Sequence, residues 1–265
     1  MKSVATSQTQ TSDTPPTTVQ RGALRWTVRA GVRDKTLDAV LENPDSFLTD
    51  KSQHFKNSRS VTVARIPLAG KSGWVLRRLN YGKPLHRLRD SLRPTRAHRA
   101  FANGLRLEQA GVPTARVLAA GEIRRLRCPV HAYLLTEEIP GAVTLEQLMK
   151  TKPAPPQKAL SSLAETLAGL HDAGFSHRDL KSSNVLFTGD LQAYLIDLDG
   201  VRRIRGPVQR QAVADLARLA KGMMVTREFS SGGWVEFLKT YCLRRGLTDW
   251  QHWVVAVAAK RDAES

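Results

Sequence analysis

Apolar and polar residues alternate in the first half of the chain. Residues 60–67 read Ser-Val-Thr-Val-Ala-Arg-Ile-Pro, and residues 74–79 continue the alternation after a glycine-containing turn at 69–73. A period of two is typical of a strand with one buried face, and a glycine turn between two such runs predicts a β-hairpin. Two further strands are predicted at 117–122 and 131–136, with a basic turn between them.

A helical period replaces this alternation elsewhere. Residues 95–110 form the first predicted helix, which ends before Pro113. In the second half of the chain, apolar residues three and four positions apart predict amphipathic helices. The positions that carry these stripes are Leu160, Leu163, Leu167, Leu170, Val213, Leu216, Leu219, Met223, Trp234, Phe237, Leu238 and Tyr241.

This order of elements, strands around one helix and then mainly helices, indicates an α+β fold with two lobes. We expect residues 21–138 to form a β-rich small lobe and residues 139–265 a mostly helical large lobe, together one domain. Residues 26–28 and 37–48 predict a short strand and a helix that pack onto the body of the protein. Residues 1–20 are rich in Ser, Thr, Gln and Pro and offer almost nothing to bury, which predicts a disordered tail.

The catalytic candidates lie in residues 177–184, His-Arg-Asp-Leu-Lys-Ser-Ser-Asn, and in the strand-like run at 193–199. Phosphoryl transfer from ATP needs a carboxylate that orients the attacking hydroxyl and accepts its proton, and oxygen ligands that hold Mg²⁺ against the phosphates. Asp179 fits the first role. Asn184 and Asp197, thirteen residues apart, fit the second. This spacing is typical of the protein-kinase-like fold, so the sequence predicts a kinase that uses ATP and Mg²⁺.

Five neighbouring residues have further predicted roles. Lys181, two positions after the aspartate, is predicted to neutralise charge on the γ-phosphate in the transition state. His177 and Arg178 are expected to brace the loop, and Asp215 to hydrogen-bond its backbone. Asp199 is compatible with a second metal-binding or hydrogen-bonding role and equally with turn formation. The competing interpretation of the whole segment is a Ser/Asn turn between two core strands.

The charge balance points to an anionic partner. The chain has 41 Lys and Arg against 24 Asp and Glu, a formal net charge of +17. The excess is concentrated at 77–99 and 202–210, and a solvated basic face and an anion-docking surface explain these runs equally well. An anionic glycolipid or a membrane surface fits this charge. Nucleic acid is not expected as a partner, because the basic runs lack interleaved aromatic residues.

Cysteine content and hydropathy bear on the compartment. Cys128 and Cys242 are too few for a disulfide framework, which favours a reducing environment. The sequence contains neither an apolar run long enough to span a bilayer nor the apolar core of a signal peptide. We therefore expect a cytoplasmic protein, peripheral on the inner face of the inner membrane.

Together these segments resemble the lipopolysaccharide core kinase family, the Kdo and heptose kinases, within the wider protein-kinase-like fold. The similarity covers about residues 58–241 and includes residues 77–81, residues 91–114 and the Leu-Ile-Asp-Leu-Asp-Gly run at 195–200. The resemblance implies transfer of the ATP γ-phosphate to a sugar hydroxyl of the lipopolysaccharide inner core. It leaves open which sugar and which hydroxyl are phosphorylated.

The same resemblance implies a nucleotide site that departs from the family pattern. Arg77 stands where the family has the lysine that reaches the α- and β-phosphates, and arginine has a larger, flat head group. The helix glutamate that pairs with that lysine falls at Ala100, although Glu108 lies nearby. Ser58 lies in a turn that replaces a glycine-rich loop and could cover phosphates. Glu137 lies where the adenine would meet the hinge.

The segment after the metal-binding strand separates the possible acceptors. Only 17 residues lie between Asp197 and Asp215, and no Ala-Pro-Glu tripeptide follows. Protein kinases build their peptide platform from a longer segment, so a sugar acceptor fits better. Two alternatives stay open: a reduced Ser/Thr-type protein kinase, and a catalytically dead kinase-like binding protein, the latter motivated by Arg77 and Ala100.

Overall fold

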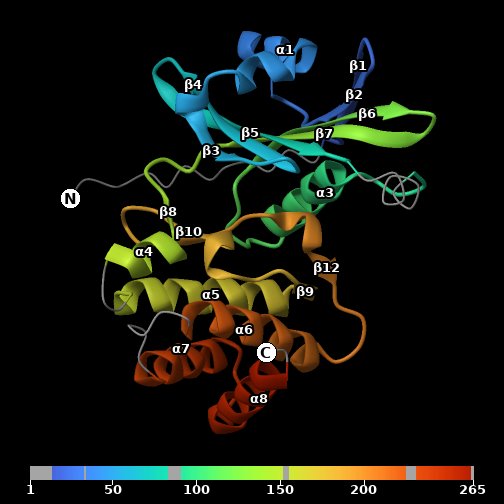
Figure 1. Cartoon of the computed structure of the whole chain (residues 1–265). Coiled ribbons are helices and arrows are strands. Elements are labelled where there is room, and N and C mark those ends of the chain that lie inside the picture. Colours follow the sequence, from blue (N-terminus) through green and yellow to red (C-terminus); the bar gives the residue numbers. More distant parts are fainter. Residues whose placement is uncertain (1–13, 33, 83–90, 152–154, 225–230, 264–265) are drawn as a thin grey trace.

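The chain forms a β-sheet lobe from its first half and a helical lobe from its second half (Figure 1). The computed structural model describes residues 14–32, 34–82, 91–151, 155–224 and 231–263. The predicted α+β class is confirmed. Part of the basic run at 77–99, residues 83–90, lies outside the described residues.

Seven antiparallel strands build the sheet, in the order β1-β2-β6-β7-β5-β4-β3. The predicted hairpin and the two predicted later strands are confirmed, and each strand except β4 is longer than the alternation indicated. The strands are β1 (Thr17–Arg21), β2 (Leu24–Val28), β3 (His54–Asn57), β4 (Val61–Leu68), β5 (Lys71–Asn80), β6 (Val117–Arg125) and β7 (Cys128–Glu137).

Strand β1 corrects the prediction of a disordered tail over residues 1–20. Thr17–Arg21 pairs along its whole length with β2, from Thr17 opposite Val28 to Arg21 opposite Leu24. Its side chains are mostly exposed, with only Val19 packed against the core, so main-chain hydrogen bonds are the main contacts of this segment. Residues 1–13 lie outside the described residues.

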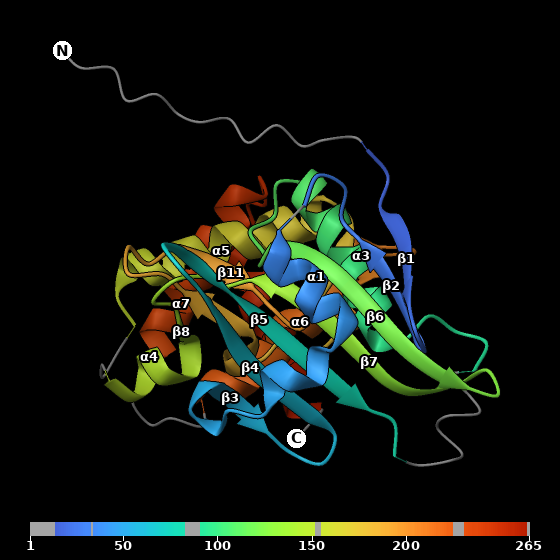
Figure 2. The same ribbon diagram turned by 90° about the horizontal axis from the view of Figure 1, so that it is seen from above.

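Helices cover both faces of the sheet. Helix α1 (Lys35–Glu42) and the 3-10 turn η1 (Pro44–Leu48) lie on the face away from the helical lobe (Figures 1 and 2). Trp26 of β2 is fully buried beneath them and donates from Nε1 to Leu41 O at 3.0 Å. Helix α3 (Arg96–Gln109) lies between the opposite face and the helical lobe. The strand expected at 26–28 is confirmed as part of β2, and the helix expected over 37–48 is divided into α1 and η1, with Pro44 beginning the second.

A glycine lets α3 approach the sheet closely. A Cβ atom on Gly104 would lie 2.5 Å from Cγ1 of Val117 on β6, closer than any real contact. This contact fixes how far α3 stands from the sheet, and thereby the position of the face that it turns toward the cleft.

The helical lobe contains α4 (Leu145–Thr151), α5 (Gln157–Asp172), α6 (Val208–Met224), α7 (Ser231–Arg244) and α8 (Trp250–Ala263). Helices α5, α6 and α7 confirm the predicted stripes. A small sheet contains three short strands, β8 (Val143–Thr144), β10 (Val185–Phe187) and β11 (Ala193–Leu195). A separate two-stranded ladder is formed by β9 (Phe175–Ser176) and β12 (Arg202–Arg203). Strand β8 directly precedes α4, and the other four strands lie between α5 and α6 in the chain. Within the described ranges, no helix is both long and apolar enough to cross a membrane.

One apolar core extends through both lobes. Buried residues of the sheet, such as Leu79 and Leu134, belong to the same cluster as Phe101 of α3 and Leu167 and Leu216 of the helical lobe. A second cluster fills the space between the sheet and α1. The lobes are therefore packed against each other.

Candidate active site

The β10–β11 hairpin brings the two predicted metal ligands together. Asn184 precedes β10 directly, and Asp197 follows β11 by two residues. The backbone N–H of Ile196 donates to Asn184 O at 3.0 Å, and His177 Nε2 donates to Ile196 O at 2.9 Å. The strand pairing thus places the catalytic loop beside the segment that carries Asp197.

Asp179 lies at the centre of a hydrogen-bonded cluster. Asn184 Nδ2 donates to the backbone O of Asp179 at 2.8 Å and to its Oδ2 at 3.2 Å, and Lys181 Nζ donates to the same Oδ2 at 3.0 Å. The Asp179 side chain is 54% exposed, and Oδ1 accepts no hydrogen bond from any residue that the structure describes. One carboxylate oxygen is therefore oriented by the protein, and the other can reach a substrate hydroxyl.

Asp215 binds the backbone of the predicted catalytic loop. Its fully buried carboxylate accepts from the backbone N–H groups of His177 (2.7 Å) and Arg178 (2.9 Å), and from Arg218 Nη1 at 3.0 Å. Burial alone would raise the pKa of Asp215, but hydrogen bonds, led by the one from His171, lower it below its ordinary value. The predicted bracing role of Asp215 is confirmed. It also fixes Arg178, whose φ of +62° is costly for a residue with a Cβ atom.

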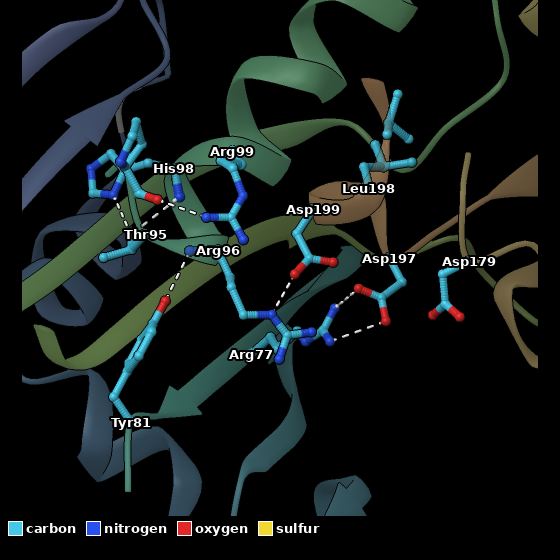
Figure 3. Close-up of polar contacts among 12 residues, drawn as sticks. Arg77, Tyr81, Thr95, Arg96, His98, Arg99, Asp179, Asp197, Leu198 and Asp199 are labelled. Carbon is cyan, nitrogen blue, oxygen red and sulfur yellow. Dashed lines mark hydrogen bonds and ion pairs between the residues drawn. The ribbon is translucent and has the colours of Figure 1, made fainter. Parts of the chain in front are cut away.

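Asp197 forms a two-point ion pair with Arg77. Nη1 of Arg77 donates to Oδ1 at 2.6 Å and Nη2 donates to Oδ2 at 3.2 Å, as Figure 3 shows. Burial by itself would raise the pKa of Asp197, but the bond and charge of Arg77 outweigh it and lower the pKa to about 2. Asp197 is therefore ionised at neutral pH. It is held at φ +62° and ψ +52°, a left-handed conformation uncommon for aspartate.

Arg96, at the start of α3, is a site residue that the sequence patterns did not indicate. Its Nε donates to Oδ2 of Asp199, two residues after Asp197 (Figure 3). Burial raises the pKa of Asp199, and Arg96 only partly offsets it. The one available signal was its place directly after the helix cap Thr95.

Ala100, predicted to stand in place of the helix glutamate, lies on α3. Ala100 is buried and carries no charge. Glu108 does not replace it, because its carboxylate is bound by Arg29 near the other end of α3, at 2.5 and 2.8 Å. An ion pair between α3 and the segment after Asp197 is made instead by Arg96 and Asp199.

Asn103 adds an uncharged contact between the lobes. Its buried Nδ2 donates to the carbonyl oxygens of Leu198 (2.7 Å) and Val201 (3.0 Å). These two acceptors bracket the 3-10 turn η4 (Leu198–Gly200), which follows Asp197 directly. Helix α3 is therefore hydrogen-bonded to the segment that follows Asp197, the candidate metal ligand.

Comparison with known proteins identifies the family. The model of the lipopolysaccharide kinase (Kdo/WaaP) family matches residues 45–241, more than half of the chain. The chain belongs to this family. The resemblance derived from the sequence is thus confirmed.

Two relatives of this chain are named as kinases. The chain is 30% identical over 135 residues to a 3-deoxy-D-manno-octulosonic acid kinase of Vibrio parahaemolyticus, covering 51% of this chain and 56% of that protein. It is 30% identical over 155 residues to the lipopolysaccharide core heptose(I) kinase WaaP of Pseudomonas aeruginosa, covering 52% and 56%. The chain therefore spans about half the length of these relatives.

The fold has a matching solved structure. The structure titled "WaaP in complex with acyl carrier protein" superimposes with a TM-score of 0.56 at 20% sequence identity, covering 88% of this chain and 98% of that one. This likeness confirms the predicted kinase-like, two-lobed fold.

In this lipopolysaccharide kinase family member, two predicted nucleotide contacts lie apart from the Asp179 cluster. Ser58 is in the turn between β3 and β4, where its hydroxyl donates to Val61 O at 3.0 Å. Glu137 ends β7 and its carboxylate accepts from Arg116 Nη1 at 2.8 Å. Within the described residues, no hydrogen bond joins either to the cluster, so their roles in nucleotide binding stay predictions.

The donor set around Asp197 fits Mg²⁺. The Nδ2 group of Asn184 is used by Asp179, which leaves its Oδ1 as a free oxygen donor, and Asp197 supplies an ionised carboxylate. Hard oxygen ligands are the ones that Mg²⁺ prefers. Across the described ranges, no group of three or more His, Cys, Asp or Glu side chains could hold a metal ion. A magnesium ion held by Asn184 and Asp197 would take its remaining ligands from water or from phosphate oxygens.

Proposed function

We propose that this family member transfers the γ-phosphate of ATP to a sugar hydroxyl, Kdo or heptose, of the lipopolysaccharide inner core. The observation that carries the proposal is the meeting of Asp179, Asn184 and Asp197, supplied by one loop and one hairpin, beside the segment that α3 contacts. Membership of the lipopolysaccharide kinase family supports the acceptor class.

The proposed transfer moves one proton, forms one bond and breaks another. The acceptor hydroxyl oxygen attacks the γ-phosphorus, its O–H proton passes to Oδ1 of Asp179, and the bond to the β-phosphate bridging oxygen breaks to release ADP. The hydrogen bonds from Asn184 and Lys181 fix Oδ2, so the free oxygen keeps one direction. The ammonium of Lys181 would then lie where charge grows on the transferred group.

Asn184 and Asp197 would hold Mg²⁺, which when bound neutralises charge on the β- and γ-phosphates. Both carboxylate oxygens of Asp197 accept from Arg77 in this structure. We propose that Arg77 moves from Asp197 to the nucleotide phosphates when the metal takes its place. Guanidinium binds phosphate and carboxylate with the same fork, so this exchange needs only a rotation of the arginine head group.

The segment after Asp197 favours a compact acceptor over a protein. Residues 202–203 pair at once with β9, and α6 begins at Val208, so little chain is left to grip a peptide. The net charge of +17 would attract an anionic glycolipid, and we propose that the enzyme works at the inner face of the inner membrane, as the family's acceptor class implies. A reduced protein kinase remains the second candidate, because the His-Arg-Asp-Leu-Lys run is typical of Ser/Thr kinases.

The test is transfer of labelled γ-phosphate from Mg-ATP to purified, dephosphorylated lipopolysaccharide core. Asp179→Asn should lower the rate at least 100-fold, since positioned acid–base groups contribute about 10² to 10⁴. Asp190→Asn is the matched control, because this exposed aspartate bonds to the Thr188 hydroxyl and to the backbone of its own turn, away from the Asp179 cluster. Label on protein alone would support a protein kinase, and nucleotide binding without any transfer would support a catalytically dead protein.

A further inference from the structure

Three arginines outside the Asp179 cluster meet at the outer side of the metal-binding segment. Arg202 lies on β12, which pairs with β9 so that Arg202 is opposite Ser176. Arg178 follows Ser176 by two residues. The two segments also approach closely at Gly200, where an added Cβ atom would lie only 3.1 Å from His177 O. The β9–β12 ladder therefore brings Arg178 and Arg202 to one place.

Helix α3 supplies the third arginine. Arg96 bonds to Asp199, and Asn103 bonds to Val201 O, so this face of α3 lies on the segment that ends at Arg202. Arg99 lies three residues after Arg96 and four before Asn103, a spacing that places it on the same face of α3. Figure 3 shows it beside Arg96. Burial, and then the charges of Arg99 and Arg178, lower the pKa of Arg202, consistent with three cations in close range.

Within the described residues, the guanidinium groups of these three arginines make no direct ion pair, although the charge of Asp199 acts on Arg202. Arg202 Nη1 donates only to backbone oxygens, Asp199 O at 2.8 Å and Val201 O at 2.7 Å. Arg99 Nη1 donates to Pro94 O at 2.9 Å, while its buried Nε has no partner. In the part of the chain that the structure describes, none of the three forms an ion pair with a carboxylate. The nearest carboxylate, Asp199, is taken by Arg96.

We propose that Arg99, Arg178 and Arg202 form a subsite for a phosphate monoester already present on the acceptor. Guanidinium groups bind phosphate oxygens in pairs, and an anion here would relieve the repulsion among the three cations. Arg178 and Arg202 are exposed, so the group can enter from solvent. Because Arg178 is the chain neighbour of Asp179, a phosphate bound here would anchor the molecule that presents the attacking hydroxyl. This inference rests on the proposed function.

The first experiment measures binding without catalysis. Inorganic phosphate is titrated into the full chain by calorimetry with a saturating nonhydrolysable ATP analogue and Mg²⁺, so that the nucleotide site is filled. Arg99→Gln and Arg202→Gln should each weaken binding about ten-fold, the size expected for one charged hydrogen bond. Arg203→Gln is the control: this neighbour is exposed, carries the same charge and alternates to the other face of β12.

The second experiment identifies the source of the phosphate. Deacylated inner-core oligosaccharide is titrated in the same way, before and after phosphatase treatment. Wild type should bind the phosphorylated form about ten-fold more tightly, and both arginine variants should lose that preference while the control keeps it. Equal affinity for the two forms in wild type would overturn the assignment to an acceptor phosphate. Unchanged phosphate binding in the variants would overturn the subsite itself.

These outcomes are separate from the fate of the proposed function. Both titrations report binding, so they decide the subsite even if no label is transferred to any glycolipid. Circular dichroism melts of the three variants check folding. A loss of binding accompanied by a melting temperature equal to that of Arg203→Gln supports the subsite, whereas binding that is retained in a folded variant contradicts it.

Discussion

Arg77 and Asp197 bind each other through two hydrogen bonds, of 2.6 and 3.2 Å, across 120 residues of sequence. The side chains are only 18% and 19% exposed. One is the cation expected to contact the nucleotide phosphates, and the other is the carboxylate expected to bind the metal. In this structure the two residues bind each other, and the proposed binding of nucleotide and metal would exchange these partners.

This ion pair predicts a pH-dependent contribution to stability. Because the pKa of Asp197 is lowered from 3.8 to about 2, the pair stabilises the folded state fully above pH 4 and loses this effect as the pH falls toward 2. Arg77→Met should lower the free energy of unfolding by about 2 kcal/mol at pH 6. Urea denaturation at a series of pH values should show this difference shrinking below pH 4. In Arg203→Gln, an exposed arginine without a carboxylate partner, no such pH-dependent difference should arise.

The contact between Arg96 and Asp199 should affect nucleotide binding. Arg96→Ala and Asp199→Ala should each raise the KM for Mg-ATP about five-fold, and the double variant should be no worse than either single variant, as expected for coupled residues. Steady-state kinetics of the four proteins checks this. Lys239→Ala, which breaks an exposed pair with Glu236 on α7, should leave this KM unchanged. Additive effects in the double variant would show that the two residues act separately.

Asp215 should be required for folding of the catalytic loop. Asp215→Ala removes a buried acceptor of two backbone N–H groups and leaves Arg218 without its partner. We expect a loss of about 4 kcal/mol in the free energy of unfolding, as for other broken buried ion pairs. Asp249→Ala, which removes only an exposed helix cap at His252 N, should cost about 1 kcal/mol. Chemical denaturation of both variants provides the comparison, and equal losses would contradict this role for Asp215.

Two helical glycines should respond to alanine with opposite signs. In Gly104→Ala the new Cβ atom meets the buried Val117 side chain at 2.5 Å, so we expect destabilisation of about 1 to 3 kcal/mol. At Gly169 of α5, no atom of the described residues beyond its own helix backbone lies within 4 Å of where an added Cβ would sit. Gly169→Ala should therefore stabilise the protein by about 0.5 to 1 kcal/mol. Thermal unfolding of the Gly104→Ala and Gly169→Ala variants checks this prediction. A stabilised Gly104→Ala variant would show that α3 can shift away from β6.

Local periodicity was sufficient to predict most elements and the central cluster. Asp179, Asn184 and Asp197 were predicted because their spacing reflects one loop and one hairpin, a local arrangement. Strand β1 was not predicted, because main-chain pairing with β2 orders it while its side chains stay exposed. Helix α8 carries no regular apolar stripe from which it could be predicted.

The partners of the charged residues could not be predicted from the sequence. Arg77 was expected to face phosphates, and Arg96 and Asn103 had no assigned role, yet all three contact residues 197–201 from nearly 100 positions away or more. Contacts over such separations depend on how the lobes pack, and no local pattern records them. The contribution of Ser58 and Glu137 to nucleotide binding stays a prediction for the same reason.

The continuous core has a consequence for how the protein unfolds. Apolar side chains of the sheet, of α3 and of the helical lobe belong to one cluster, and the two bonds of Asn103 add a polar link between the lobes. Neither lobe can lose its packing without exposing the core of the other. Heating should therefore produce a single cooperative transition, with equal calorimetric and van't Hoff enthalpies, instead of stepwise melting of two halves.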